Sequence, residues 1–323
     1  MFIQWLLRGC ASLGIVLAAA SSHAQGGPVS VLVGLPPGGA SDTLARLVSH
    51  ELSDQLKRTF IVENRPGASG SIAAQAVTRA RPDGGTLLFT PSTHSTNAVL
   101  YPTLTYDTKK DFKAVGIVAS TPYVLVVHPS VSATNLAELL EYLRGDKEKA
   151  FFATASAGSS QHISVALLGQ LTGIDHIQMV HYKGSAAALP DILSGRVPMM
   201  FDNIALMLPY IQDGRLRPIA VTSRQRFPRL SDVPTIAESG FPDFDVTGWF
   251  GLLAPSHTPD AVVSQFSEAL KTVRMSPEFS AKVLDIGGEP VTSGRTGSDA
   301  DDFISKDIDR MRQIIETAGI KLD

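Results

Sequence analysis

The sequence predicts an α/β protein with two lobes, between which the chain crosses twice. The 323 residues are enough for about two domains. Short apolar strands alternate with segments of helical periodicity, a pattern typical of mainly parallel sheets covered by helices. Proline-containing stretches near 123–129 and 221–228 interrupt this alternation and indicate the crossings. We therefore expect residues 25–124 and 226–323 in the first lobe and 125–225 in the second.

The first lobe begins with a strand at 29–35 and a helix in which Leu44, Val48 and Leu52 share one face. Ser41 or Asp42 is the expected N-cap of that helix. The other elements expected in this lobe are strands at 60–62, 86–90 and 249–254 and helices at 71–79, 259–273 and 298–318. An apolar pair of strands within 115–127, interrupted at 121–122, is expected to lead out of the lobe.

The second lobe repeats the same alternation within about a hundred residues. After the first crossing, four helices and four strands follow one another along the chain. The helices are expected at 136–143, 163–171, 186–193 and 204–211, and the strands at 151–154, 177–180, 197–201 and 218–221.

Residues 1–24 have the pattern of a secretory signal. Arg8 precedes an apolar run at 11–20, and small residues lead up to Ala24, after which we expect cleavage. A lipoprotein anchored at Cys10 is the alternative, but its apolar run would have to precede the cysteine. Cleavage after Ala24 removes the only cysteine, which suits an oxidising compartment, because nothing in the mature chain can mispair.

The composition narrows the classes of function. The chain is 44% apolar and 18% charged, with a formal net charge of -3, as in an ordinary globular protein. It lacks the basic excess of a nucleic-acid-binding protein, so we do not expect nucleic acid as a partner.

The loop after the first strand is the strongest candidate for a binding site. It contains Gly38, Gly39, Ala40, Ser41 and Asp42 and leads directly into a helix. Glycines let backbone N–H groups turn toward a ligand, and the free N–H groups of a helix start attract an anion. The alternative is a plain strand-to-helix turn with a cap.

The second lobe contains a similar candidate binding loop between a strand and a helix. Ser156, Gly158, Ser159 and Ser160 connect a strand to a helix and supply both N–H and O–H donors. Two such loops, one in each lobe, are what a ligand cleft between lobes requires. Neither loop contains a nucleotide-binding motif, which disfavours phosphate chemistry.

Four further residues are weaker candidates. Thr93 and His94 follow a strand in a polar loop that could line the cleft or simply be solvated. Lys183 could supply a positive charge, although a surface role is favoured. Asp202 ends a buried strand, where ligands of open α/β sheets bind, or it caps the next helix.

Signatures of enzymes and metal sites are missing from the sequence. It has no Gly-x-Ser-x-Gly elbow, no His-Glu-x-x-His motif and no cysteine nucleophile in the mature chain. The spacing of His162, His176 and His181 matches no usual ligand set. We expect a protein without catalytic residues, metal or cofactor.

Seven short motifs in one order resemble the Bug proteins, the periplasmic receptors of tripartite tricarboxylate transporters. The resemblance covers essentially the whole mature chain. The motifs are PPGG at 36–39, NRPGASG at 64–70, PDG at 82–84, YKG at 182–184, MFDN at 200–203, DVPT at 232–235 and AGIK at 318–321.

The resemblance implies a periplasmic-binding-protein fold, type II-like, whose two α/β lobes close over a carboxylate-bearing ligand. Backbone amides and ordered water would hold the ligand, and membrane permease subunits would receive it from a monomeric receptor. The gripping residues would be those of the two loops, with Thr93, His94 and Asp202 less firmly assigned. Leu35 and Gly85 depart from the family pattern.

Two other functions use the same architecture. A periplasmic sensor could report its ligand to a membrane partner through the same closure of the lobes. An enzyme could also be built on this scaffold, because fold alone does not fix function. The missing catalytic motifs argue against the enzyme.

Overall fold

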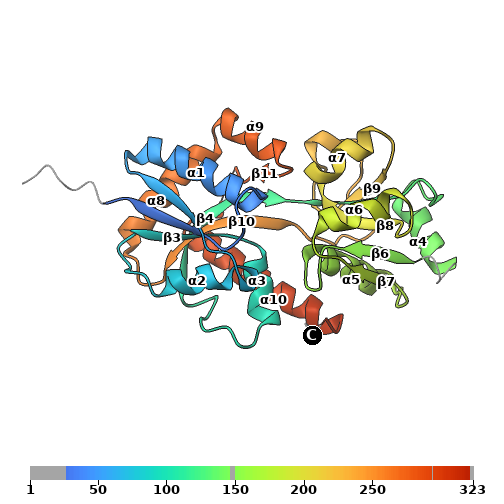
Figure 1. Ribbon diagram of the computed structural model, residues 1–323, viewed down its shortest axis with the longest axis horizontal. Coiled ribbons are helices and arrows are strands. Elements are labelled where there is room, and N and C mark those ends of the chain that lie inside the picture. The colour runs from blue at the N-terminus through green and yellow to red at the C-terminus, as the bar shows by residue number, and fades with distance from the viewer. Residues whose placement is uncertain (1–26, 146–149, 293, 321–323) are drawn as a thin grey trace, which may run out of the picture.

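The computed structural model describes residues 27–145, 150–292 and 294–320, so the expected signal at 1–24 lies outside the described part. Two sheets form the centres of two lobes (Figure 1). The first sheet contains β1 (Val29–Val33), β2 (Phe60–Asn64), β3 (Thr86–Pro91), β4 (Phe112–Thr121), β10 (Gly248–Pro255) and β11 (Glu289–Pro290). The second contains β5 (Tyr123–Val127), β6 (Phe151–Thr154), β7 (Gln178–His181), β8 (Met199–Asn203) and β9 (Arg217–Val221).

Both sheets have the same strand pattern. Their orders are β11-β4-β10-β3-β1-β2 and β7-β6-β8-β5-β9. Each has three neighbouring parallel strands, followed by a strand that runs antiparallel to its neighbours, β10 in one and β5 in the other. Each of these antiparallel strands lies next to a crossing, so the two lobes are interlocked through the chain path.

Helices cover both faces of each sheet (Figure 1). Apolar side chains of the strands alternate between two core layers in each lobe, as period-two strands require. One face of the first sheet carries α1 (Ala40–Leu56), α8 (Asp260–Arg274) and α9 (Pro277–Asp285), and the other carries α2 (Ser71–Thr78), α3 (Thr93–Leu100) and α10 (Ser298–Thr317). The second sheet lies between α4 (Leu136–Gly145) and α5 (Ser160–Thr172) on one face and α6 (Ser185–Leu193) and α7 (Ile204–Gln212) on the other.

The first crossing is tight, because only Pro122 separates β4 from β5. The second is more gradual. After β9, Phe227 and Val233 still pack in the core of the second lobe beside α6 and α7, and Phe244 and Val246 pack on its other face. We propose that this crossing lies at 247–248, later than the division at 225/226 that the sequence suggests.

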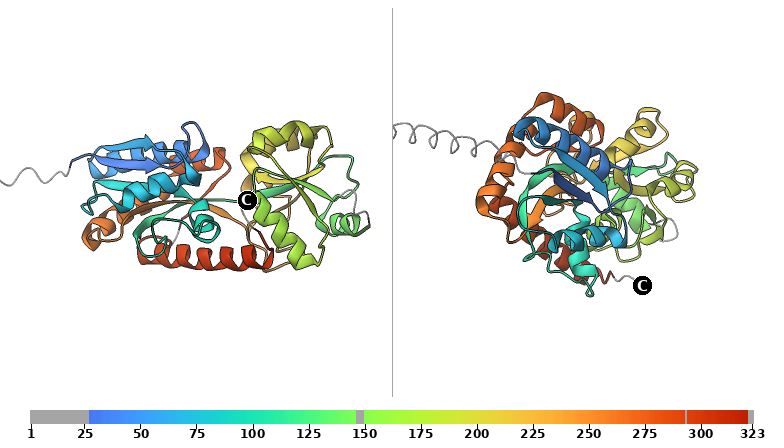
Figure 2. Two further views of the ribbon diagram at one scale, coloured as in Figure 1. Left: turned by 60° about the horizontal axis from the view of Figure 1, so that its bottom comes forward. Right: turned by 60° about the vertical axis from the view of Figure 1, so that its left-hand side comes forward.

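Helix α10 extends beyond the first lobe. Its earlier residues Ile304 and Ile308 pack under the first sheet, whereas Met311, Ile314 and Ile315 belong to the core of the second lobe. Figure 2 shows this helix, in red, running from one lobe to the other. The lobes are therefore joined by two strand crossings and a helix.

The lobes also touch through α9 and α7. Arg229 forms an ion pair with Asp285 at 3.0 Å. The backbone of Gly287 lies so close to the start of α7 that a Cβ there would be 2.6 Å from the amide nitrogen of Ala205. Both contacts link the turn after α9 to the second lobe.

Two helices differ from the sequence prediction. Helix α3 occupies a stretch expected to be a polar loop, because its core-facing side chains, Ser95, Thr96 and Asn97 among them, are polar and give no apolar period. Helix α9 begins at Pro277 after the capping residue Ser276, a start signal that the sequence contained. Among the described residues, no helix has the length and apolar character needed to cross a membrane.

Candidate functional site

The strand registers bring the carboxyl ends of the parallel strands of both lobes to the junction. In the first sheet, Gly248 pairs with Thr121, and two residues later Phe250 pairs with Pro91 at the end of β3. In the second sheet, Tyr123 pairs with Asn203 at the end of β8. The loops after β1, β3, β6 and β8 therefore face one another, which is where open α/β sheets bind ligands.

The loop after β1 presents free backbone donors, and its cap differs from the Ser41 or Asp42 that the sequence predicted. Gly39 is the N-cap of α1, and no side chain caps the helix. The first helical bond runs from Thr43 N–H to Gly39 O at 3.0 Å. The N–H groups of Ala40, Ser41 and Asp42 consequently have no helical acceptor, and the helix dipole adds partial positive charge there.

The side chain of Asp42 braces this loop from beneath. Its buried carboxylate accepts bonds from Gly38 N–H at 3.0 Å, Arg46 Nε at 3.1 Å and Asn64 Nδ2 at 3.0 Å. Burial alone would raise the pKa of Asp42, but these bonds together lower it. Gly38 and Asp42 are both expected to contact ligand, but in the structure the Gly38 N–H and the Asp42 carboxylate bond to each other.

The loop after β6 is braced in a similar way by histidine. Gly158 N–H donates to His162 Nδ1 at 3.0 Å. Ser159 Oγ donates to Ser156 O at 2.7 Å and accepts from His162 N–H at 3.3 Å. The Ser159 hydroxyl is therefore occupied within the loop, and the N–H groups of Ser160 and Gln161 are the ones without a helical acceptor.

His162 must be neutral to act as this acceptor. Burial, together with the nearby His181, lowers the pKa of His162 to about 4. The two rings lie with their centroids 4.9 Å apart. At neutral pH, the Nδ1 atom of His162 is consequently free to accept from Gly158.

Asp202 holds the starts of two helices together. Its Oδ1 accepts from Gln161 Nε2 at 3.2 Å and from Asn203 N–H at 2.7 Å, and the Gln161 amide also reaches Ser185 Oγ at 3.3 Å. The side chain is only 2% exposed, and burial raises the pKa of Asp202. It is placed to position α5 and α6 behind the cleft.

The segment after β3 contributes other residues to the junction between the lobes than the two that the sequence predicted. His94 is buried inside the first lobe, 5.0 Å from the ring of Phe112, and burial lowers its pKa to about 4. Thr93 is partly exposed at the start of α3. Ser92 and Thr96 instead line a small interlobe cavity with Ser160. His94 is therefore not brought together with the gripping loops.

Tyr123 is a candidate that the sequence reasoning missed. Its hydroxyl forms a hydrogen bond with the Ser160 side chain, and burial raises its pKa. A Cβ on Gly248 would lie 3.3 Å from this hydroxyl. Tyr123 thus forms part of the floor between the loops. The break between strands at Pro122, immediately before Tyr123, is the feature of the sequence that could have pointed to it.

The three histidines do not form a metal site. His176 Nε2 lies 2.8 Å from Leu143 O, away from the His162–His181 pair. His181 Nδ1 lies 2.6 Å from Thr154 Oγ1. Over the described ranges, no three His, Cys, Asp or Glu side chains come together as metal ligands would. Lys183 is exposed in the loop after β7.

Comparison with known proteins places the chain in a family. Residues 44–320 match the model of the tripartite tricarboxylate transporter family receptor, TctC. The chain belongs to this receptor family. The resemblance to Bug proteins and the predicted two-lobed fold are thereby confirmed.

Solved structures agree over nearly their whole length. The R. palustris protein Rpa4515 with adipate is 36% identical, with a TM-score of 0.77, covering 91% of this chain and 98% of that one. The periplasmic binding protein BugD is 30% identical, with a TM-score of 0.74 and coverages of 91% and 98%. MatC from Rhodopseudomonas palustris with bound malate is 30% identical, with a TM-score of 0.73 and coverages of 89% and 98%.

Proposed function

We propose that this receptor captures a small carboxylate in the periplasm and delivers it, unchanged, to the membrane subunits of a tripartite tricarboxylate-type transporter. Export would remove residues 1–24 by cleavage after Ala24, and the receptor would act as a monomer. The two lobes, each of which carries one gripping loop, would close over the ligand, because both loops contact the ligand only in the closed state.

The observation that carries the proposal is the pair of helix starts at the facing sheet edges. The N–H groups of Ala40, Ser41 and Asp42 in one lobe and of Ser160 and Gln161 in the other lack helical acceptors. Such donors bind carboxylate oxygens through charge-assisted hydrogen bonds worth about 1.5–3 kcal/mol each.

Relatives indicate the class of ligand. Adipate and malate, which two of the solved relatives hold, are both dicarboxylates. A dicarboxylate has a charged group for each gripping loop. We therefore propose a small dicarboxylate for this chain, gripped by backbone donors at both ends.

The test is a thermal-shift and calorimetric screen of mono-, di- and tricarboxylates with their amides as controls. A ligand at about a hundred times its dissociation constant should stabilise the protein by about 2.7 kcal/mol. The amide of the same ligand should give no comparable shift. Recovery of the ligand in chemically altered form would contradict a receptor role and favour an enzyme.

Gly39→Val is the sharpest variant. The backbone of Gly39 has φ −84° and ψ 173°, and its nearest neighbour would be 4.0 Å from a new Cβ, so the fold accommodates valine. The branched side chain would nevertheless stand over the free N–H groups. Affinity should fall by at least tenfold, and by less in the matched variant Lys183→Ala. Loss of binding only in Lys183→Ala would replace the backbone site with a side-chain ion pair.

A further inference from the structure

A second cavity lies behind the strands that connect the lobes. It measures about 330 Å³ and is lined by Ser120 of β4, Glu289 of β11 and Arg224, which follows β9. In the sheet orders, β4, β11 and β9 lie on the far side of β10 and β5 from the strands that bear the gripping loops. We call this cavity the rear pocket.

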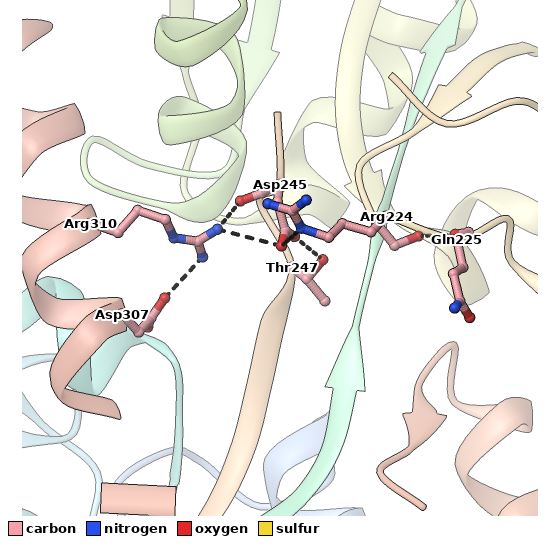
Figure 3. Close-up of polar contacts among 7 residues, drawn as sticks. Arg224, Gln225, Asp245, Thr247, Asp307 and Arg310 are labelled. Carbon is pink, nitrogen blue, oxygen red and sulfur yellow. Dashed lines mark hydrogen bonds and ion pairs between the residues drawn. The ribbon is translucent and has the colours of Figure 1, made fainter. Parts of the chain in front are cut away.

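Both lobes and the helix between them contribute charged groups to the rear pocket. Figure 3 shows those of the second lobe and of α10. Asp245 lies 3.2 Å from Arg224 Nε and 3.7 Å from Arg310 Nη1. Arg310 also donates to Asp307 at 2.9 Å, and Asp307 accepts from the Trp249 indole at 2.8 Å. The two aspartates are therefore already engaged by cations or donors.

Arg295 differs from these paired groups. Its guanidinium lies over the ring of Phe303, 4.1 Å from the centroid. Among the described residues, no carboxylate comes within ion-pair distance of it, although Asp245 and Asp307 attract it from further away. Arg295 is thus a cation at the pocket wall, steadied by an aromatic ring and still able to accept an anionic partner.

The backbone that presents Arg295 is strained and held in place. Arg295 has φ 53°, a left-handed conformation that non-glycine residues rarely adopt. The buried Arg274 fixes this turn by donating to Ile117 O at 2.7 Å and to Gly294 O at 3.1 Å. Ile117 N–H in turn donates to Arg295 O at 2.9 Å. The fold therefore maintains an unfavourable conformation that points this side chain at the pocket.

The charge balance favours an anion. The lining contains four cationic side chains, Arg224, Arg295, Lys306 and Arg310, and three carboxylates, Asp245, Glu289 and Asp307. Asp245 and Asp307 are engaged by Arg224 and Arg310. That leaves Arg295 and Lys306 against Glu289, a partly buried carboxyl whose pKa is raised by burial. The uncommitted charge in the rear pocket is consequently positive.

We propose that the rear pocket binds a small dianion, whose oxygens lie between Arg295 of the first lobe and the terminal nitrogens of Arg224 of the second, whose bond to Asp245 runs from Nε. A guanidinium pairs with carboxylate, sulfate or phosphate oxygens through parallel N–H bonds. This site is distinct from the gripping loops and extends the proposed function, because a ligand held there contacts both lobes.

Occupation of the rear pocket is coupled to the front cleft. Arg310, Asp307, Thr247 and Gly248 line both the rear pocket and the small cavity beside Ser160. We expect a rotation that closes the front loops about this shared wall to move the rear walls apart. A rear anion therefore opposes closure, and by linkage each ligand weakens the binding of the other by the same factor.

Tryptophan fluorescence gives a local readout for the test. The sequence contains two tryptophans, and without residues 1–24 only Trp249 remains, bonded to Asp307 at the pocket wall. The mature protein is titrated with sodium sulfate and, separately, sodium succinate, at an ionic strength kept constant with sodium chloride. We expect a saturable change with one or both dianions, and the two arms distinguish oxyanion from carboxylate.

The variants separate the rear pocket from the front cleft. Arg295→Gln should weaken the rear-pocket titration at least tenfold, and Arg224→Gln should do the same if Arg295→Gln folds poorly. The matched control is Arg215→Gln, which removes a guanidinium that lies 5.5 Å over Tyr210 in the second lobe, outside the pocket. Gly39→Val, which blocks the front loops, should leave the rear titration intact.

Three results would overturn the proposal: no saturable change in the unsubstituted protein, equal binding by Arg295→Gln and the control, or loss of the titration in Gly39→Val. A dicarboxylate thermal shift that survives in Arg295→Gln would show that the front site functions even if the rear site fails.

Discussion

Asp42→Asn tests whether a buried carboxylate shapes the first gripping loop. The substitution keeps the size of the side chain and the Oδ1 acceptor for Asn64, but it puts an amide NH₂ where Oδ2 faces Gly38 N–H and Arg46 Nε. Two charge-assisted bonds are lost, one of them to a half-exposed arginine. We expect a loss of about 2–4 kcal/mol in the free energy of unfolding.

The dependence on pH supplies a second check. Because the folded state lowers the pKa of Asp42, its stabilising effect is complete above the unfolded value of about 3.9 and is lost as pH falls through the lower folded pKa. Urea unfolding should therefore show a constant difference between the two proteins from pH 5 to 7 and a shrinking one below about pH 4.

Asp54→Asn is the matched control on the same helix. Its side chain is 70% exposed and lies 3.8 Å from His50, so the cost should stay below about 0.5 kcal/mol. Dicarboxylate affinity should fall in Asp42→Asn and stay unchanged in the control. Equal urea midpoints for Asp42→Asn and Asp54→Asn would refute the idea that the carboxylate braces the loop.

Three further predictions concern the buried histidines and the contacts between lobes. His94 and His162, whose pKa values fall to about 4, should each make the protein about 2 kcal/mol less stable at pH 5 than at pH 7.5, because only the unfolded state takes up their protons readily. In urea unfolding, His94→Phe should therefore remove about 2 kcal/mol, which is half of their combined loss. Gly287→Val should change the radius of gyration measured by small-angle scattering, since its side chain would collide with the Ala205 amide; an unchanged radius would mean that the lobes do not rest on this contact. Arg229→Gln breaks an exposed interlobe ion pair and should cost less than about 1 kcal/mol in thermal unfolding, whereas a larger loss would show that the pair is structurally important.

The architecture was predictable because strand and helix periods are local properties of the sequence. The two loops proposed to grip the ligand could be selected for the same reason, since glycines and small hydroxyl residues follow β1 and β6 directly. The direction of individual side chains was not predictable. Asp42 and His162 turn back to bond their own loops, and this depends on neighbours such as Asn64 that arrive from elsewhere in the chain.

Helix α3 shows a second limit. The polar residues that follow β3 gave no helical period, so His94 was expected in a loop beside the ligand. The structure instead buries this ring between Tyr106 and Phe112, where aromatic stacking replaces aliphatic packing. Contacts formed by residues distant in sequence, such as Tyr123 with Ser160, could not be inferred from local pattern either.

The path of α10 limits the kinds of movement open to the receptor. Because Ile308 is anchored in one core and Ile314 in the other, the helix acts as a rigid strut beside the two strand crossings. A rigid helix anchored in both cores should resist separation and sideways sliding of the lobes, while it still allows one lobe to rotate about the point where the helix is attached. We therefore expect ligands of different lengths to be accommodated by the loops rather than by the spacing of the lobes.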